Sequence, residues 1–263
     1  MLGKADAGRQ GESPGIAFGV REGIDAQHVV RLYSIITFSP LDTPQGLWRG
    51  YHMRPTLPPP NPPRAVAFFD GQNLFHSVKD AFGYRFPNYD VLKLAQVVCA
   101  QQGWLLEGVR FYTGVPDPAD NPFWHHFWVA KCGQMGRDGV RIFTRSLRYR
   151  NKIVRLPDGS EHSFLDGDEK GIDVRIALDV VRGAYMREYD VAVLFCRDQD
   201  FSEVADDIRL IAREQGRWIK IASAFPFSPA SKMRGVDKTD WIRLDRTLYD
   251  GCIDRRDYRP KAT

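Results

Sequence analysis

The sequence predicts an α/β protein with a central parallel sheet. From Arg64 onward, short apolar runs alternate with stretches that have helical periodicity. Two of the apolar runs, Ala65–Phe69 and Val191–Phe195, are continuous, which is typical of strands buried on both faces. Strands separated by helices connect through right-handed crossovers and lie parallel. We therefore expect helices on the faces of one buried sheet.

Composition excludes a membrane-spanning or secreted disulfide-rich chain. No apolar run is long enough to cross a bilayer, and the first residues lack the apolar core of a signal peptide. The four cysteines form no CxxC pair, so we expect buried free thiols in a reducing compartment. The 37 basic and 33 acidic residues nearly balance, so the distribution of charge tells more than its sum. We expect a cytoplasmic protein without membrane contact.

The first 63 residues are expected to form an N-terminal extension, partly disordered, that precedes the folded domain. Gly, Ser and charged residues dominate its beginning. Its end, Arg54–Arg64, holds six prolines in eleven residues, a density typical of an extended polyproline II linker. We place the domain boundary at this linker, with the main domain over residues 64–224 and peripheral elements of the same domain over residues 225–263.

Within the main domain each apolar run predicts a strand and each periodic stretch a helix. Residues 146–168 break this rhythm, because two β-prone runs flank Pro157-Asp158-Gly159, which indicates a hairpin. In the tail, Trp241–Leu244 and Leu248–Cys252 are expected to be short elements. The predicted strands are 65–69, 109–113, 140–144, 190–196 and 218–223, and the predicted helices are 73–82, 89–102, 122–135, 170–187 and 201–215.

Aspartates follow two of the predicted strands at the point where each strand ends. Asp70 follows the first, and Asp198 and Asp200 follow the fourth. The carboxyl ends of parallel strands form the edge where open α/β sheets bind ligands. Local explanations remain open for some of these residues: Asp70-Gly71 suits a turn, Asn73 suits a helix N-cap, and Asp200 with Glu203 resembles a capping box. Asp198 has no such local explanation.

Asp173 lies on the apolar side of the predicted helix 170–187, with Ile176 and Val180. A carboxylate that faces a core must be paired, hydrogen-bonded or bound to a metal. Asp70, Asp173, Asp198 and Asp200 come from three separate segments, and carboxylates gathered together repel unless a cation joins them. Oxygen ligands without His or Cys favour Mg²⁺ or Mn²⁺. The sequence therefore predicts an acidic divalent-metal site.

Three segments of the chain, in this order, resemble the signature segments of the NYN domain, a branch of the PIN-like nuclease superfamily. They are VAFFDGQNL, EKGIDVRIALDVV and VLFCRDQDFSEV. The resemblance implies a three-layer α/β/α fold with strand order 3-2-1-4-5, which places Asp70 opposite Asp198 and Asp200. It also implies metal-binding roles for the four aspartates and places Asn73 near the reacting phosphate. The chain departs from the family at Cys196-Arg197, where Ser-Gly is usual.

Basic residues are concentrated between Lys131 and Arg155, with aromatic residues among them. Basic residues beside an acidic site could bind the phosphate backbone of a nucleic acid. The alternative is a solvent-exposed hairpin with ordinary surface arginines. The pair His125-His126 lies among aromatic residues, so both are expected to be packed or partly exposed helix residues and not metal ligands. The residues predicted to contact substrate are Arg145, Arg148, Arg150, Lys152, Lys170 and Arg197.

These features predict a metal-dependent ribonuclease that hydrolyses phosphodiester bonds of single-stranded or structured RNA, with Asp70, Asn73, Asp173, Asp198 and Asp200 as catalytic residues. The alternative is an inactive domain of the same fold that binds RNA or a protein. A haloacid-dehalogenase-type phosphatase is disfavoured because Gln72 stands where its second aspartate belongs. The oligomeric state stays open, a homo-oligomer included.

Overall fold

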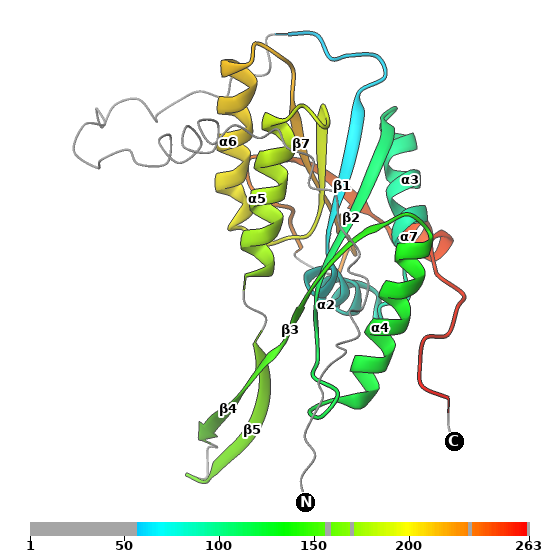
Figure 1. Cartoon of the computed structure of the whole chain (residues 1–263), viewed down its shortest axis with the longest axis vertical. Coiled ribbons are helices and arrows are strands. Elements are labelled where there is room, and N and C mark those ends of the chain that lie inside the picture. Colours follow the sequence, from blue (N-terminus) through cyan, green and yellow to red (C-terminus); the bar gives the residue numbers. More distant parts are fainter. Residues whose placement is uncertain (1–56, 156–158, 169–170, 231–232, 262–263) are drawn as a thin grey trace, which may run out of the picture. The chain divides into compact units, whose positions relative to one another are not determined.

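Figure 1 shows the computed structural model of the chain, which describes residues 57–155, 159–168, 171–230 and 233–261. For residues 148–152 and 163–168 it describes the backbone and not the side chains. Most of the predicted N-terminal extension, residues 1–56, lies outside the described residues. The described part of the proline-rich linker, residues 57–63, contains neither helix nor strand.

The core of the domain is a six-stranded parallel sheet with the order β3-β2-β1-β6-β7-β8. The first five of these strands have the expected order 3-2-1-4-5. The expectation missed the sixth strand, which extends the sheet beyond β7 and comes from the tail. The strands are β1 (Arg64–Asp70), β2 (Leu105–Val115), β3 (Arg141–Ser146), β6 (Val191–Phe195), β7 (Lys220–Pro226) and β8 (Asp240–Leu244).

Helices cover both faces of the sheet and complete the three layers visible in Figure 1. One face carries α2, α3, α4 and α7, and the other carries α5 and α6. The helices are α2 (Gly71–Phe82), α3 (Val91–Gln101), α4 (Pro122–Arg137), α5 (Ile172–Tyr185), α6 (Phe201–Glu214) and α7 (Arg246–Gly251).

Strand β1 shows how the sheet positions the site. Ala67 and Phe69 enter the core under α2, α3 and α4, whereas Val66 and Phe68 enter the core under α5 and α6. Both sets are buried, which confirms that a continuous apolar run marks a strand covered on both faces. Because successive side chains of a strand alternate, Asp70 follows Val66 and Phe68 toward the α5 and α6 side.

The predicted hairpin forms a separate two-stranded antiparallel sheet of β4 (Arg148–Arg155) and β5 (Glu161–Asp168). In Figure 1 it continues from the end of β3 and extends away from the helices of the domain. Its turn, residues 156–158, lies outside the described residues. The hairpin ends close to the start of α5, so it connects the sheet edge to the helix that carries Asp173.

Among the described residues all four cysteines are free thiols, and Cys132 is only half-buried while the other three are buried. No described helix has both the length and the apolar character needed to cross a membrane. The expectation of buried free thiols therefore holds for Cys99, Cys196 and Cys252 and not for Cys132.

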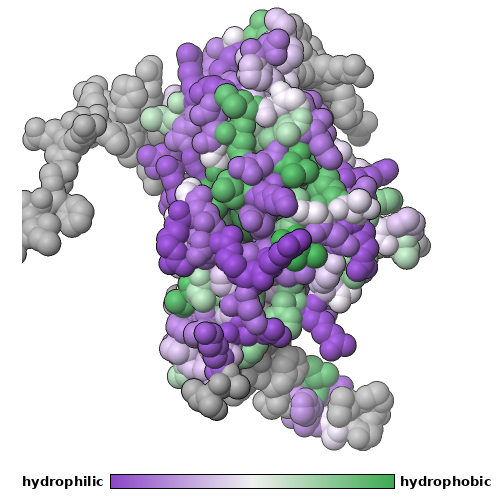
Figure 2. All heavy atoms as spheres, turned by 90° about the vertical axis from the view of Figure 1, so that its right-hand side faces the viewer, coloured by the Kyte–Doolittle hydropathy of each residue, from purple (hydrophilic) through white to green (hydrophobic). Residues whose placement is uncertain are grey.

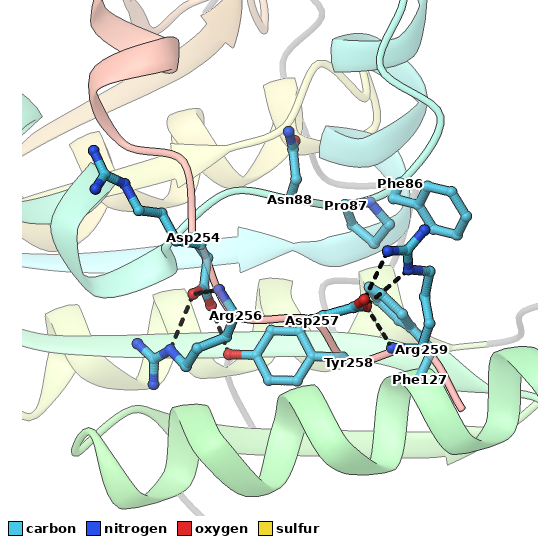
Figure 3. Close-up of a pocket in the computed structure, with 10 residues that line it drawn as sticks. Phe86, Pro87, Asn88, Phe127, Asp254, Arg256, Asp257, Tyr258 and Arg259 are labelled. Atoms are coloured by element: carbon cyan, nitrogen blue, oxygen red, sulfur yellow. Dashed lines mark hydrogen bonds and ion pairs between the residues drawn. The ribbon is translucent and has the colours of Figure 1, made fainter. Parts of the chain in front are cut away.

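The C-terminal residues 253–261 pack against α4, on the side that Figure 2 shows as mainly hydrophilic with smaller hydrophobic groups. A cavity of about 220 Å³ lies there, and Figure 3 shows two bonded pairs of charged residues that line it. Asp254 accepts from Arg256 at 3.0 Å, and Asp257 accepts from Arg259 at 2.6 Å. Arg256 also donates to Asp138 at the end of α4 at 2.9 Å, and Tyr258 packs on Phe127, so the segment is bonded to α4.

Lys131 does not belong to the basic surface that the sequence predicts between Lys131 and Arg155. Its side chain is fully buried beneath this C-terminal segment. Its Nζ donates to the carbonyl of Tyr89 at 2.9 Å and lies 3.8 Å from the carboxylate of Asp254. Burial lowers the pKa of Lys131 to about 8, and Asp254 opposes that shift. Lys131 therefore belongs to the core and does not face a substrate.

Candidate acidic site

Asp70 stands at the end of β1 and begins α2. Its side chain accepts a hydrogen bond from the backbone N–H of Asn73 at 2.9 Å, so Asp70 is the N-cap of the helix. Gly71 allows this sharp entry, because a Cβ there would lie 2.5 Å from the Phe111 ring on β2. The N-cap that the sequence analysis assigned to Asn73 is thus held by Asp70.

The capping hydrogen bond lowers the pKa of Asp70 by less than burial and the neighbouring carboxylates raise it. The residue is 6% exposed, and burial raises its pKa to about 7 despite the bond from Asn73. The nearby carboxylates of Asp173 and Asp198 are smaller contributions to this same rise. A helix cap held by an ordinary aspartate would keep a low pKa, so local capping alone does not account for this residue.

Asp173 lies in the first turn of α5 and faces the same place. Burial raises its pKa, followed by the charges of Asp198 and Asp200, while a hydrogen bond with the Asp70 carboxyl lowers it. The Asp173 side chain is thus close to all three of the other aspartates. The start of α5 has no side-chain cap, because the N-cap is Gly171 at φ 78°.

Asp198 and Asp200 lie in the turn between β6 and α6. β6 pairs directly with β1, which brings the two strand ends together at one edge. The Asp198 side chain accepts from the backbone N–H of Asp200 at 3.0 Å, and Asp200 makes no side-chain capping bond to α6. The capping-box explanation for Asp200 is therefore not supported. The structure gathers all four predicted aspartates at the carboxyl edge of the sheet.

Asn73 links α2 to this turn. Its Oδ1 accepts from the backbone N–H of Arg197 at 2.9 Å. The guanidinium of Arg197 turns toward α2 and the later loop, where it donates to Ser77 Oγ at 3.4 Å and to the carbonyl of Arg234 at 3.3 Å. The bulky residue at the position where the family has glycine is thus held by hydrogen bonds to its neighbours.

The chemistry of this donor set fits a hard divalent cation, because crowded carboxylates with raised pKa values are stabilised when a cation replaces their protons. In the part of the chain that the structure describes, no group of three or more His, Cys, Asp or Glu side chains is arranged to hold a metal ion as it stands. One oxygen of Asp70 accepts from the N–H of Asn73 and one oxygen of Asp198 accepts from the N–H of Asp200, which fixes one side of each carboxylate.

Of the predicted substrate-binding residues, Arg145 has the clearest relation to the site. Its guanidinium lies 3.1 Å from the position that a Cβ of Gly171 would take, two residues before Asp173, and also lies over the Phe143 ring. Lys170 lies outside the described residues, as do the side chains of Arg148, Arg150 and Lys152. His125 is half-buried, and its Nδ1 is bonded to the carbonyl of Pro116 at 2.8 Å, as a packed histidine would be.

Two groups near the aspartates went unrecognised in the sequence. Tyr112, paired with Asp70 across β1 and β2, donates to Asp179 at 2.8 Å, and Arg175 donates to the same oxygen at 3.0 Å. Gln199, between the two aspartates of the turn, bonds a distant segment. Tyr112 and Gln199 are recognised as neighbours of the site only through the residues that they bond, and Asp179, Gly235 and Asp237 are remote from them in sequence.

Comparison with known proteins identifies a family. Residues 64–238 match the NYN domain. No curated protein matches the chain. A protein of unknown function from Vibrio parahaemolyticus is 18% identical, with 72% of this chain and 98% of that chain covered and a TM-score of 0.43.

Two further solved structures resemble the chain at lower TM-scores. Ribokinase from Giardia lamblia is 12% identical, covering 49% of this chain and 37% of that chain, with a TM-score of 0.28. MurG from Acinetobacter baumannii is 13% identical, covering 69% of this chain and 45% of that chain, with a TM-score of 0.27. Likenesses of this size identify neither an activity nor a ligand. The match over residues 64–238 shows that this chain belongs to the NYN domain family of the PIN-like nuclease superfamily.

Proposed function

We propose that this protein is a metal-dependent ribonuclease that hydrolyses RNA phosphodiester bonds at the acidic edge of the sheet. One observation carries the proposal: Asp70 is nearly buried, its pKa is raised to about 7, and two further carboxylates contribute to the shift. Crowding acids without a function costs stability, so such clusters are typical of functional sites. Membership of a family whose members are usually nucleases supports the same reaction class.

The four aspartates would hold one or two Mg²⁺ or Mn²⁺ ions. A bound ion of this kind supplies an activated water and stabilises charge on the phosphate. Asn73 would orient the phosphate through its side-chain Nδ2, because its Oδ1 is already engaged with Arg197. Arg145, on β3 with its guanidinium beside the residue that precedes α5, would contact a neighbouring phosphate of the RNA.

The basic hairpin extends this surface beyond the acidic edge. Arg148, Arg150 and Lys152 lie on β4, which follows β3 after one residue, and Lys170 precedes α5. Phosphate contacts of this kind would hold single-stranded or structured RNA without reading its sequence. Arg197, held beside Ser77, would contact the backbone on the other side of Asn73.

The test is cleavage of labelled RNA by purified protein with Mn²⁺ or Mg²⁺. We expect Asp198→Asn to abolish cleavage while the circular dichroism spectrum is retained. Asp240→Asn is the matched control, because Asp240 is exposed and pairs only at the surface with Lys220. A wild-type protein that leaves varied RNAs intact with either metal would refute the enzymatic proposal.

A non-cleaving RNA-binding domain is the second candidate. It is favoured by Arg197, which adds bulk and charge beside the site. RNA binding that persists in EDTA and survives Asp198→Asn, without cleavage by wild type, would favour this candidate.

A further inference from the structure

Gln199 has an unusual set of partners for a residue between two site aspartates. Its Nε2 donates to the carbonyls of Arg197 at 3.1 Å and Gly235 at 3.0 Å, and its Oε1 accepts from the backbone N–H of Asp237 at 3.1 Å. Both ends of the amide are therefore used. The reversed amide would set oxygen against two carbonyls, so the observed orientation is the one that the partners require.

The segment that receives these bonds, residues 235–237, is itself firmly anchored. A Cβ at Gly235 would lie 2.5 Å from Ser223 Oγ on β7 and 2.7 Å from the Trp241 ring on β8. Val236 is fully buried, and its N–H donates to Ser223 Oγ at 3.1 Å. The carbonyl of Val236 accepts from the indole N–H of Trp241 at 2.8 Å. Gln199 thus ties the turn after β6 to the segment that precedes β8.

The turn is held on its other side as well. Before Gln199, the N–H of Arg197 is bonded to Asn73 on α2. After it, the N–H of Asp200 is bonded to the side chain of Asp198. The Gln199 side chain points to residues 235–237, whereas Asp198 and Asp200 both act on Asp173. The turn is thereby fixed between α2 and the 235–237 segment.

We propose that Gln199 is a positioning residue that holds Asp198 and Asp200 against Asp70 and Asp173 before a cation binds. This inference rests on the proposed function. Four carboxylates repel one another, and a free turn would relieve that repulsion by moving its two aspartates away. The three hydrogen bonds between the Gln199 side chain and backbone groups oppose this movement and keep the aspartates in place. The free energy needed to bring the carboxylates together is then supplied by folding, and cation binding does not have to supply it.

The experiment measures Mn²⁺ affinity by isothermal titration calorimetry in wild type and Gln199→Met. Methionine keeps the length and the neutral charge of the side chain and cannot form the three bonds. We expect the dissociation constant for Mn²⁺ to rise about 10-fold, as is found when partners that orient metal ligands are removed. RNA cleavage by the variant should recover when Mn²⁺ is raised in proportion, because the ligands themselves are intact.

Gln215→Met is the matched control. Gln215 also uses both ends of its amide, donating to the carbonyl of Tyr185 at 2.9 Å and accepting from Arg217 at 3.0 Å, but it lies at the far end of α6. Its loss should leave the Mn²⁺ affinity within about twofold of wild type. A purely structural effect of losing a bonded glutamine would appear in both variants alike.

Gln199→Asn keeps the amide with a shorter reach and replaces Gln199→Met should that variant fail to fold. Its Mn²⁺ affinity should fall about threefold. Wild-type affinity in the Gln199 variants, with wild type binding Mn²⁺, would overturn the positioning role and leave the ribonuclease proposal standing. Absence of Mn²⁺ binding to wild type would overturn both.

Discussion

Two buried aspartates on neighbouring strands have opposite surroundings. Asp70 ends β1 and is 6% exposed, and Asp190 precedes β6 and is 8% exposed. Asp190 accepts from the N–H and the guanidinium of Arg64 at 3.0 and 3.2 Å, and from Arg217 at 3.1 Å. Asp70 instead has two carboxylates that raise its pKa. The sheet thus carries a compensated aspartate at its amino edge and an uncompensated one at its carboxyl edge.

The difference separates a structural role from a functional one. The arginines beside Asp190 join the starts of β1 and β6 to the end of α6, so their partner completes the fold. The acids beside Asp70 oppose one another and stabilise nothing unless a cation or a proton is present. Burial alone would not distinguish the two residues, whereas the sign of the neighbouring charges does.

The largest expected effect concerns activity. Asp70→Asn should reduce RNA cleavage by at least about 100-fold, because it removes a ligand of the proposed ion. Asp190→Asn should leave the cleavage rate of the folded protein within about threefold of wild type. Both are measured as single-turnover rates at saturating Mn²⁺. Equal losses in the two variants would erase the distinction between the two edges.

The next effect concerns stability and runs in the opposite direction. Asp190→Ala should lower the free energy of unfolding by roughly 3 kcal/mol, because it leaves Arg217 without its carboxylate. In metal-free buffer at pH 8, Asp70→Asn should not lower it, because the variant removes a repelling charge. Urea unfolding followed by circular dichroism measures both. A metal-free Asp70→Asn protein much less stable than wild type would contradict the account.

The pH dependence of stability gives a third, smaller effect. The pKa of Asp70 is about 7 in the folded protein and close to 4 in an unfolded chain, so the folded state binds the proton more tightly. Its contribution is fully present below about pH 4 and is lost as pH rises through 7, by on the order of 4 kcal/mol in total. In EDTA, the difference between wild type and Asp70→Asn should therefore grow in favour of the variant from pH 5 to pH 8. Parallel curves would show that Asp70 titrates normally.

The smallest expected effect concerns substrate affinity. Arg145→Gln should weaken RNA binding about fivefold at low salt and reduce the slope of log K against log salt by roughly one phosphate contact. Arg243→Gln is a matched control, because Arg243 is exposed on the edge strand β8 at the other side of the sheet. Fluorescence anisotropy with labelled RNA in Ca²⁺ measures both variants. Identical salt slopes for wild type and Arg145→Gln would exclude that contact.

The alternating pattern of the sequence sufficed to predict most of the fold. Two-sided burial makes β1 and β6 uniformly apolar, and the helices between them leave parallel pairing as the simplest arrangement. Strand β8 was missed as a member of the sheet, because DWIRL is short, mixes its apolar residues with two charged ones and lies on an edge of the sheet with only Ile242 and Leu244 buried. An edge strand needs less apolar sequence than a central one and so gives a weaker signal.

The gathering of the aspartates could also be predicted, because strand ends of a parallel sheet meet at one edge. The buried state of Lys131 could not, since its partners Tyr89 and Asp254 lie far away along the chain. The role inferred for Gln199 was likewise hidden, because glutamine carries no pattern of its own and residues 235–237 follow it only after a helix and a strand. Residue types and periodicity predict which residues lie at the strand ends, whereas side-chain contacts between segments that are distant in sequence are found only in the structure.

The most direct test is calorimetric titration of Mn²⁺ into the wild-type protein at pH 7, in two buffers with different ionisation enthalpies. Because the pKa of Asp70 is about 7, we predict binding that releases roughly half a proton, and release that disappears in Asp70→Asn. No binding at millimolar Mn²⁺, or binding that the Asp70→Asn variant leaves unchanged, would contradict the account.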